Sequence, residues 1–192
     1  IARLKALLPA PRRVALYAHD PALLGGPARG LLPTEIFEAI RATADSVFWL
    51  VRLHPRALSL INLMNEFLDQ HGIRNAETYF ASTCQLDHVA RLADVVASKY
   101  SVSALEAASL GKPVIVHSRT GERTFAPYYD SGLFRTCLDG AAVAEAARGF
   151  TAPPGARIDY VTADPDIAAA ALDALIEADP AALAGPGGAW DA

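Results

Sequence analysis

The sequence predicts an α/β domain, in which a parallel sheet is covered by helices on both faces. Short β-branched or aromatic runs alternate along the chain with segments whose apolar residues recur at helical spacing. The run 47–53 is continuously apolar, as is typical of a strand buried on both faces. With 192 residues, 52% of them hydrophobic, the chain is long and apolar enough for one sizeable core.

The elements follow in order from these patterns. The expected strands are 13–18, 47–53, 77–81, 94–98, 113–116 and 133–138. The expected helices are 34–45, 57–72, 85–93, 101–110, 141–150 and 165–178. Thr34 is the expected cap of its helix, and Gly72 is expected to stop the helix that has His71 in its last turn. The glycine-rich segment 25–30 is expected to be a mobile loop.

These elements divide the chain into three parts. Residues 1–12 are a lead-in, residues 13–150 form the α/β domain, and residues 151–192 form a linker, a last helix and a flexible tail. The chain begins at Ile1 with no signal-peptide pattern, and we expect it to be a fragment of a longer protein.

Composition excludes several function classes. The formal net charge of −4 argues against binding of bulk nucleic acid. No apolar run approaches the roughly 20 residues that a membrane span needs. Two cysteines, Cys84 and Cys137, make neither a disulfide framework nor a metal-binding spacing, and we expect free thiols in a reducing cytoplasm. No metal or cofactor is expected.

In a parallel α/β sheet, ligands bind at the carboxyl ends of the strands, and the loops that follow strands are the candidates for a site. One such loop is His54-Pro55-Arg56, directly after the run 47–53. An imidazole and a guanidinium at the start of a helix suit a phosphate group. The alternative is that His-Pro only ends the strand and leaves the imidazole exposed.

The stretch "YSVSALEAASLGKPVIV" (100–116) carries the second candidate loop. Ser101 is the expected helix cap, and the free N–H groups near Val102 and Ser103 would then favour an anion. Glu106 follows among apolar neighbours that predict a buried position, and its carboxylate could accept hydrogen bonds from the two hydroxyls of a ribose. The alternative is a capping device with a solvated acid.

The segment 93–116 resembles the nucleotide-binding half of GT-B glycosyltransferases, nearest to bacterial capsule and surface-polysaccharide transferases. CDP-glycerol polymer transferases and bacterial polysialyltransferases are more distant members of that group. These families combine a strand ending in Asp-Tyr-Ser-Ser, a Glu-Ala helix and Gly-Lys-Pro with an earlier His-Pro pair, which "RLHPR" (52–56) matches. The resemblance implies a Rossmann-like sheet, the C-terminal half of the GT-B fold. It further implies that His54 and Ser101 hold the phosphates of the nucleotide and that Glu106 holds the ribose.

Two positions depart from the pattern of the glycosyltransferases, and one segment resembles a second family. Lys99 stands where the family has Asp, and Val102 stands where it has the second Ser, a role that Ser103 could take. The segment "RTGERT" (119–124) is similar to a loop of non-hydrolysing nucleotide-sugar 2-epimerases, which share the fold. In that loop, Arg123 either pairs with Glu122 on the surface or, like Arg119, contacts the donor.

The resemblance implies an enzyme that transfers a sugar or polyol phosphate from a CMP-, CDP- or UDP-linked donor during capsule or surface-polysaccharide assembly. The implied donor-binding residues are His54, Pro55, Arg56, Tyr100, Ser101, Ser103, Glu106, Arg119 and Arg123. The catalytic groups remain unidentified, because the general base belongs to the N-terminal half of such enzymes. The implied partners are therefore that half, a nucleotide-sugar donor and a glycan or lipid-linked acceptor. A cytoplasmic location is expected, with contact to the inner face of the membrane through the other half. The alternatives are an epimerase-like enzyme and a non-catalytic scaffold derived from the GT-B fold.

Overall fold

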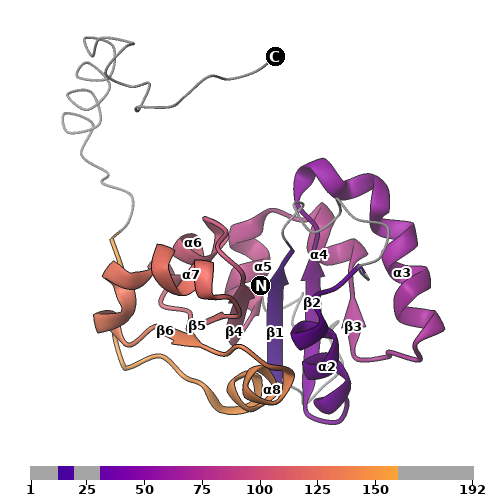
Figure 1. Ribbon diagram of the computed structural model, residues 1–192. Coiled ribbons are helices and arrows are strands. Elements are labelled where there is room, and N and C mark those ends of the chain that lie inside the picture. The colour runs from indigo at the N-terminus through magenta and orange to yellow at the C-terminus, as the bar shows by residue number, and fades with distance from the viewer. Residues whose placement is uncertain (1–12, 20–30, 160–192) are drawn as a thin grey trace, which may run out of the picture. The chain divides into compact units, whose positions relative to one another are not determined.

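The computed structural model describes residues 13–19 and 31–159, and this part of the chain forms one parallel sheet of six strands. The strands are β1 (Arg13–Ala18), β2 (Val47–Arg52), β3 (Ala76–Glu77), β4 (Val95–Ser98), β5 (Val114–Val116) and β6 (Phe134–Thr136). Their order across the sheet is β3-β2-β1-β4-β5-β6, and every neighbouring pair is parallel (Figure 1). The predicted Rossmann-like fold class is confirmed.

Helices cover both faces of the sheet. The helical elements are α2 (Thr34–Ala42), η2 (Pro55–Leu60), α3 (Ile61–Gln70), α4 (Tyr79–Thr83), α5 (Leu86–Leu92), α6 (Ser103–Ser109), α7 (Arg119–Thr124), η3 (Ala126–Ser131) and α8 (Gly140–Gly149). Buried side chains of α2, α3 and α8 form one core with alternate residues of the central strands, such as Ala15 and Tyr17. Leu16 is equally buried but lies outside that core, because successive strand residues point to opposite faces. Figure 1 shows α2 and α8 side by side on their face.

The buried strands agree closely with the sequence prediction. β1 has the predicted bounds, and β2 is buried at five of its six positions, which follows from its continuous apolar run. The glycine stop after α3 is confirmed: His71 is the last-turn cap residue, and Gly72 has a φ of +66°, in the left-handed region that glycine adopts without strain.

The expected strand 77–81 is wrong for most of its length. β3 ends at Glu77, and α4 begins at Tyr79. The Glu77 carboxylate accepts hydrogen bonds from the backbone N–H groups of Phe80 and Ala81, both at 2.9 Å. This capping stabilises the first turn of a helix and overrides the β propensity of the two aromatic residues.

Other boundaries differ for equally local reasons. Thr34 does not cap α2, because Pro33 occupies the cap position and no side chain caps that turn. α2 ends at Ala42, where the Thr43 hydroxyl donates back to the Ala39 carbonyl at 2.8 Å. The expected helix 57–72 begins as the 3₁₀ element η2 after His54 and becomes α-helical only in α3. The segment 119–124, expected as a loop, forms α7.

Several predictions fall on residues outside the described part of the chain: the mobile loop 25–30, the helix 165–178, the lead-in and the tail. After α8, Ile158 is buried and its N–H donates to the Ala108 carbonyl of α6 at 3.4 Å. Cys84 and Cys137 are free thiols, and only Cys137 is fully buried.

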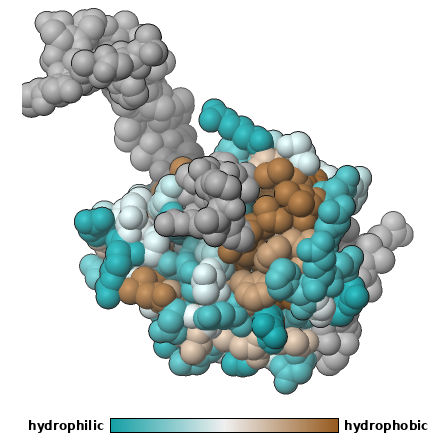
Figure 2. All heavy atoms as spheres, turned by 45° about the vertical axis from the view of Figure 1, so that its right-hand side comes forward, coloured by the Kyte–Doolittle hydropathy of each residue, from teal (hydrophilic) through white to brown (hydrophobic). Residues whose placement is uncertain are grey.

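The surface carries a hydrophobic area on the side of the domain that bears α3 (Figure 2). Leu58 of η2 and Leu63 of α3 are exposed, and Leu60 and Phe67 beside them are partly buried. Within residues 13–19 and 31–159, none of the helices has the length and hydropathy needed to cross a membrane.

Candidate functional site

The two predicted loops lie at the same edge of the sheet, the one formed by the carboxyl ends of the strands. β1 lies between β2 and β4, so the strand order reverses there, and such a switch point is where ligands bind in open α/β sheets. His54 follows β2 and Ser101 follows β4, on the two sides of β1. Strand spacings of about 4.8 Å place the ends of β2 and β4 about 10 Å apart. The fold thus puts the two candidate phosphate-binding loops on opposite sides of one strand end.

The His54 ring is held by its own loop. Its Nδ1 accepts a hydrogen bond from the Arg56 backbone N–H at 3.2 Å, so the neutral ring carries its proton on Nε2. His54 is partly exposed, and Pro55 and Arg56 are exposed. This arrangement presents an N–H donor at the carboxyl end of β2, which is the property that binding of a phosphate oxygen requires.

Serine hydroxyls organise the loop between β4 and α6. The buried Ser98 Oγ accepts from the Ser101 N–H at 3.1 Å, and the Ser101 Oγ accepts from the Ser103 N–H at 3.2 Å. Ser101, which precedes Val102 at the start of α6, therefore caps the helix with its hydroxyl. The expectation that the Ser103 N–H is free for an anion is wrong, because that N–H already donates to Ser101. Tyr100 lies beneath the Lys99 ammonium, which is 5.2 Å from the ring centroid.

Glu106 lies on α6 and is half-buried rather than buried, which corrects the expected environment. Among the described residues its carboxylate forms no hydrogen bond or ion pair, and the helix start is capped by Ser101 instead. The serine cap and the half-exposed acid fit the alternative of a capping device with a solvated acid as well as they fit the ribose role, and the carboxylate is accessible to a ligand. Burial lowers the pKa of Arg52, and the nearby charge of Glu106 opposes that shift with a smaller effect.

The two arginines of α7 lie at the surface. The Arg119 side chain is 72% exposed and pairs with Glu122 at 2.8 Å, so the surface ion pair, one of the two interpretations of this segment, forms with Arg119 and not with Arg123. Residues 119 and 122 are three positions apart and therefore lie on the same side of the helix. Residues 122 and 123 are adjacent in sequence, and adjacent side chains of a helix do not face each other. Arg123 is exposed as well. An exposed pair of this kind contributes less than about 1 kcal/mol.

Sequence reasoning missed Arg52, at the end of β2. Its Nη1 donates to the Ala81 carbonyl and, at 2.6 Å, to the Cys84 carbonyl, so it holds the carboxyl end of α4 against the end of β2. A charged residue at the end of an otherwise apolar strand was the available signal.

His117 and Glu35 form a second missed feature, beside the switch point. The His117 side chain is 1% exposed, and its Nδ1 lies 2.8 Å from a carboxylate oxygen of Glu35, in the first turn of α2. The ring packs edge-on against Tyr17, with 5.6 Å between centroids. His117 directly follows β5, so it lies in a loop that the rule on strand ends selects, although nothing in the sequence singled out this residue within the loop.

The pKa of Glu35 reflects this contact. Burial alone would raise that pKa, but the hydrogen bond with His117, a backbone hydrogen bond and the charges of His117 and Lys99 together hold it below 4.5. A lowered pKa in the folded state means that the ionised carboxylate stabilises the fold above pH 4.5 and that this contribution is lost as pH falls through the lower, folded-state pKa.

We expect the Glu35→Gln variant to be less stable than the wild type at neutral pH. The difference between the two proteins should shrink as pH falls below 4.5, because protonation removes the advantage of the wild-type carboxylate. Urea midpoints of both proteins from pH 7 to about pH 3 measure this. A difference that stays constant or grows towards acid would contradict the assigned contact.

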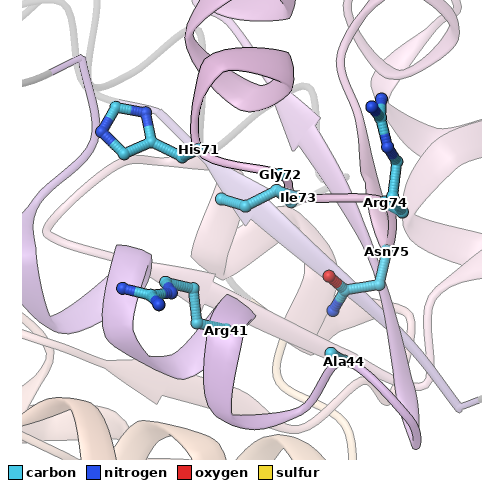
Figure 3. Close-up of a pocket in the computed structure, with 7 residues that line it drawn as sticks. All are labelled: Arg41, Ala44, His71, Gly72, Ile73, Arg74 and Asn75. Atoms are coloured by element: carbon cyan, nitrogen blue, oxygen red, sulfur yellow. The ribbon is translucent and has the colours of Figure 1, made fainter.

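A pocket of about 320 Å³ lies away from these loops, at the edge formed by the amino ends of the strands (Figure 3). Ala44 lies between α2 and β2, and Asn75 directly precedes β3, so the pocket is at the amino ends of the strands. The Asn75 side-chain amide connects α2 to β2 by donating to the carbonyls of Ile40 and Val47. The pocket includes none of the predicted donor-binding residues.

Solved structures share this fold. The wall teichoic acid polymerase TagF is 16% identical with a TM-score of 0.54, covering 77% of this chain and 37% of its own. A Listeria monocytogenes protein described as a UDP-N-acetylglucosamine 2-epimerase is 17% identical with a TM-score of 0.52, covering 75% and 37%. Staphylococcus aureus MnaA bound to UDP is 19% identical with a TM-score of 0.50, covering 71% and 35%.

The fold is GT-B-like. At these identities the comparisons establish the fold alone, and this chain spans little more than a third of the length of those neighbours. No protein-family model and no curated protein matches the sequence.

Proposed function

We propose that this chain is the donor-binding half of a glycosyltransferase that uses a CMP-, CDP- or UDP-activated donor in the assembly of a capsule or surface polysaccharide. The observation that carries the proposal is the placement of His54 and the serine-capped start of α6 on the two sides of β1, at the switch point of a GT-B-like sheet. Glu106 lies farther along α6, where its available carboxylate suits ribose hydroxyls.

The chemistry of such a half is mainly electrostatic. N–H and hydroxyl donors stabilise the negative charge that develops on the leaving phosphate when the bond to the transferred group breaks. A general base and an acceptor site are proposed to lie in a second half, with which this chain would form the complete enzyme. The acceptor would be a glycan or a lipid-linked glycan.

A second candidate function is epimerisation of a nucleotide sugar. The structural similarity to a protein described as a 2-epimerase, close in TM-score to that of TagF, favours it. An epimerase changes the sugar without an acceptor, so incubation of the complete enzyme with donor alone distinguishes the two activities. A non-catalytic scaffold need not bind a nucleotide, so a nucleotide-binding measurement distinguishes it from the two enzymes.

We expect the chain to bind at least one of CMP, CDP and UDP in a calorimetric titration. The His54→Ala variant should bind it about fivefold more weakly, the factor that loss of one hydrogen bond carries. His88→Ala, which removes an exposed imidazole from α5, is the matched control and should bind like the wild type. Circular dichroism should show that both variants remain folded.

Two results would contradict this proposal. One is the absence of binding to all three nucleotides at millimolar concentration. The other is an equal loss of affinity in the His54 and His88 variants, which would mean that His54 has no specific part in binding.

A further inference from the structure

Ser118 joins two neighbouring loops at the carboxyl edge through a single hydroxyl. It follows β5 and is the cap residue of α7, where its Oγ accepts from the Gly121 N–H at 2.9 Å. The same Oγ donates to the backbone carbonyl of Lys99 at 2.9 Å. The start of α7 is therefore hydrogen-bonded to the loop that connects β4 to α6.

Gly121 allows α7 to approach that loop closely. A Cβ placed on Gly121 would lie 1.8 Å from the Lys99 carbonyl oxygen and 2.7 Å from Cγ1 of Val116. Neither distance is possible, and a backbone carbonyl cannot move aside as the end of a flexible side chain can. Glycine is a weak helix former, so its presence inside α7 is explained by this contact and not by helix propensity.

The Lys99 carbonyl belongs to the loop that carries the proposed phosphate-binding serine. Ser98 accepts from the Ser101 N–H, and Ser101 accepts from the Ser103 N–H. The backbone of Ser98 is held from the same side, since its carbonyl accepts from the His117 N–H at 3.2 Å. A shift of Lys99 would be passed along this short chain of hydrogen bonds to the Ser101 hydroxyl.

We propose that Ser118 and Gly121 are positioning residues: they set the conformation of the loop from Lys99 to Ser103 and, through it, the affinity for the phosphates of the donor. This inference rests on the proposed function. It gives α7 a role that does not depend on Arg119 or Arg123, whose side chains are exposed. The helix acts through its backbone and its cap, without touching the ligand.

The first test needs no ligand. Amide hydrogen exchange of Ser101 and Ser103 is measured by NMR in the wild type, Gly121→Ala and Ser118→Ala. We expect exchange of these two amides to become about fivefold faster in Ser118→Ala, because one capping hydrogen bond is lost, and faster still in Gly121→Ala. Ser118→Thr keeps the hydroxyl and should restore slow exchange.

Matched controls separate this effect from general destabilisation. Gly149→Ala places a methyl group in α8, where nothing lies within 4 Å, and Thr120→Ala changes an exposed residue of α7 itself. Both should leave the exchange of Ser101 and Ser103 unchanged. If Gly121→Ala does not fold, the Ser118 pair of variants decides the question alone. Unchanged exchange in Ser118→Ala, or equal acceleration in the controls, would overturn the proposal.

The second test measures affinity for CDP and for inorganic pyrophosphate. Because the loop is proposed to hold phosphate, both affinities should fall about fivefold in Ser118→Ala and recover in Ser118→Thr. Equal CDP binding by the wild type and Ser118→Ala would overturn the positioning role. A wild type that binds no nucleotide would overturn the proposed function instead, and the exchange measurement would still decide whether α7 controls the loop.

Discussion

Replacing Glu106 with Gln should weaken the binding of a nucleoside diphosphate about tenfold or more. A hydrogen bond to an ionised group is worth roughly 1.5–3 kcal/mol, and the amide keeps the shape of the side chain while removing its charge. Inorganic pyrophosphate has no ribose, so its affinity should change much less. Calorimetric titration of the variant and the wild type with both ligands measures the difference.

The Glu106 carboxylate can be replaced without breaking a polar contact within the described part of the domain, so a change in affinity reports on the ligand. It forms no hydrogen bond or ion pair within the part of the chain that the structure covers, and the substitution should therefore cost little stability. Glu66→Gln, on the exposed surface of α3, is the matched control and should bind both ligands like the wild type. Equal losses for nucleotide and pyrophosphate in Glu106→Gln would reject the ribose role.

Replacing Trp49 with Ala should lower the free energy of unfolding by about 3–5 kcal/mol, because it empties the space of a large side chain in the core. Trp49 lies on β2, is fully buried, and its indole N–H donates to the Thr43 hydroxyl at 2.9 Å. A loss of this size is a large part of the roughly 5–15 kcal/mol that stabilises a typical domain. Urea denaturation at equilibrium gives the value.

Two further variants show where the effect originates. Trp49→Phe retains much of the apolar contact and should lose about 1 kcal/mol through the missing hydrogen bond. Leu63→Ala, at a side chain that is 47% exposed on α3, should change stability far less than Trp49→Ala. Similar losses at Trp49 and Leu63 would contradict the core position of the indole.

The fold was predictable where a local pattern and its environment agree. The apolar run of β2 is buried as a continuous strand, and the glycine after α3 adopts the left-handed conformation that a helix stop favours. The segment after β3 was not predictable in this way. There, a carboxylate that caps a helix outweighed the β propensity of Tyr79 and Phe80, and only the positions of atoms reveal such a competition.

The candidate site was predictable as a set of loops but not as a set of contacts. The rule that ligands bind after strands selected His54 and Ser101 from the sequence alone, and both lie at the carboxyl edge. The states of individual groups did not follow from that rule. Ser101 uses its hydroxyl to engage the Ser103 N–H, and Glu106 is only half-buried.

By itself, the sequence determined the α/β class, the main strands and which loops follow them, because hydrophobic periodicity and turn residues act over a few neighbouring positions. The tertiary structure alone decided which loops become neighbours. It placed β1 between β2 and β4, and it joined Glu35 to His117, 82 residues apart in the chain. It also brought Gly121 against the Lys99 carbonyl. Such contacts depend on strand order and on close packing between distant segments, and no local pattern in the sequence records either.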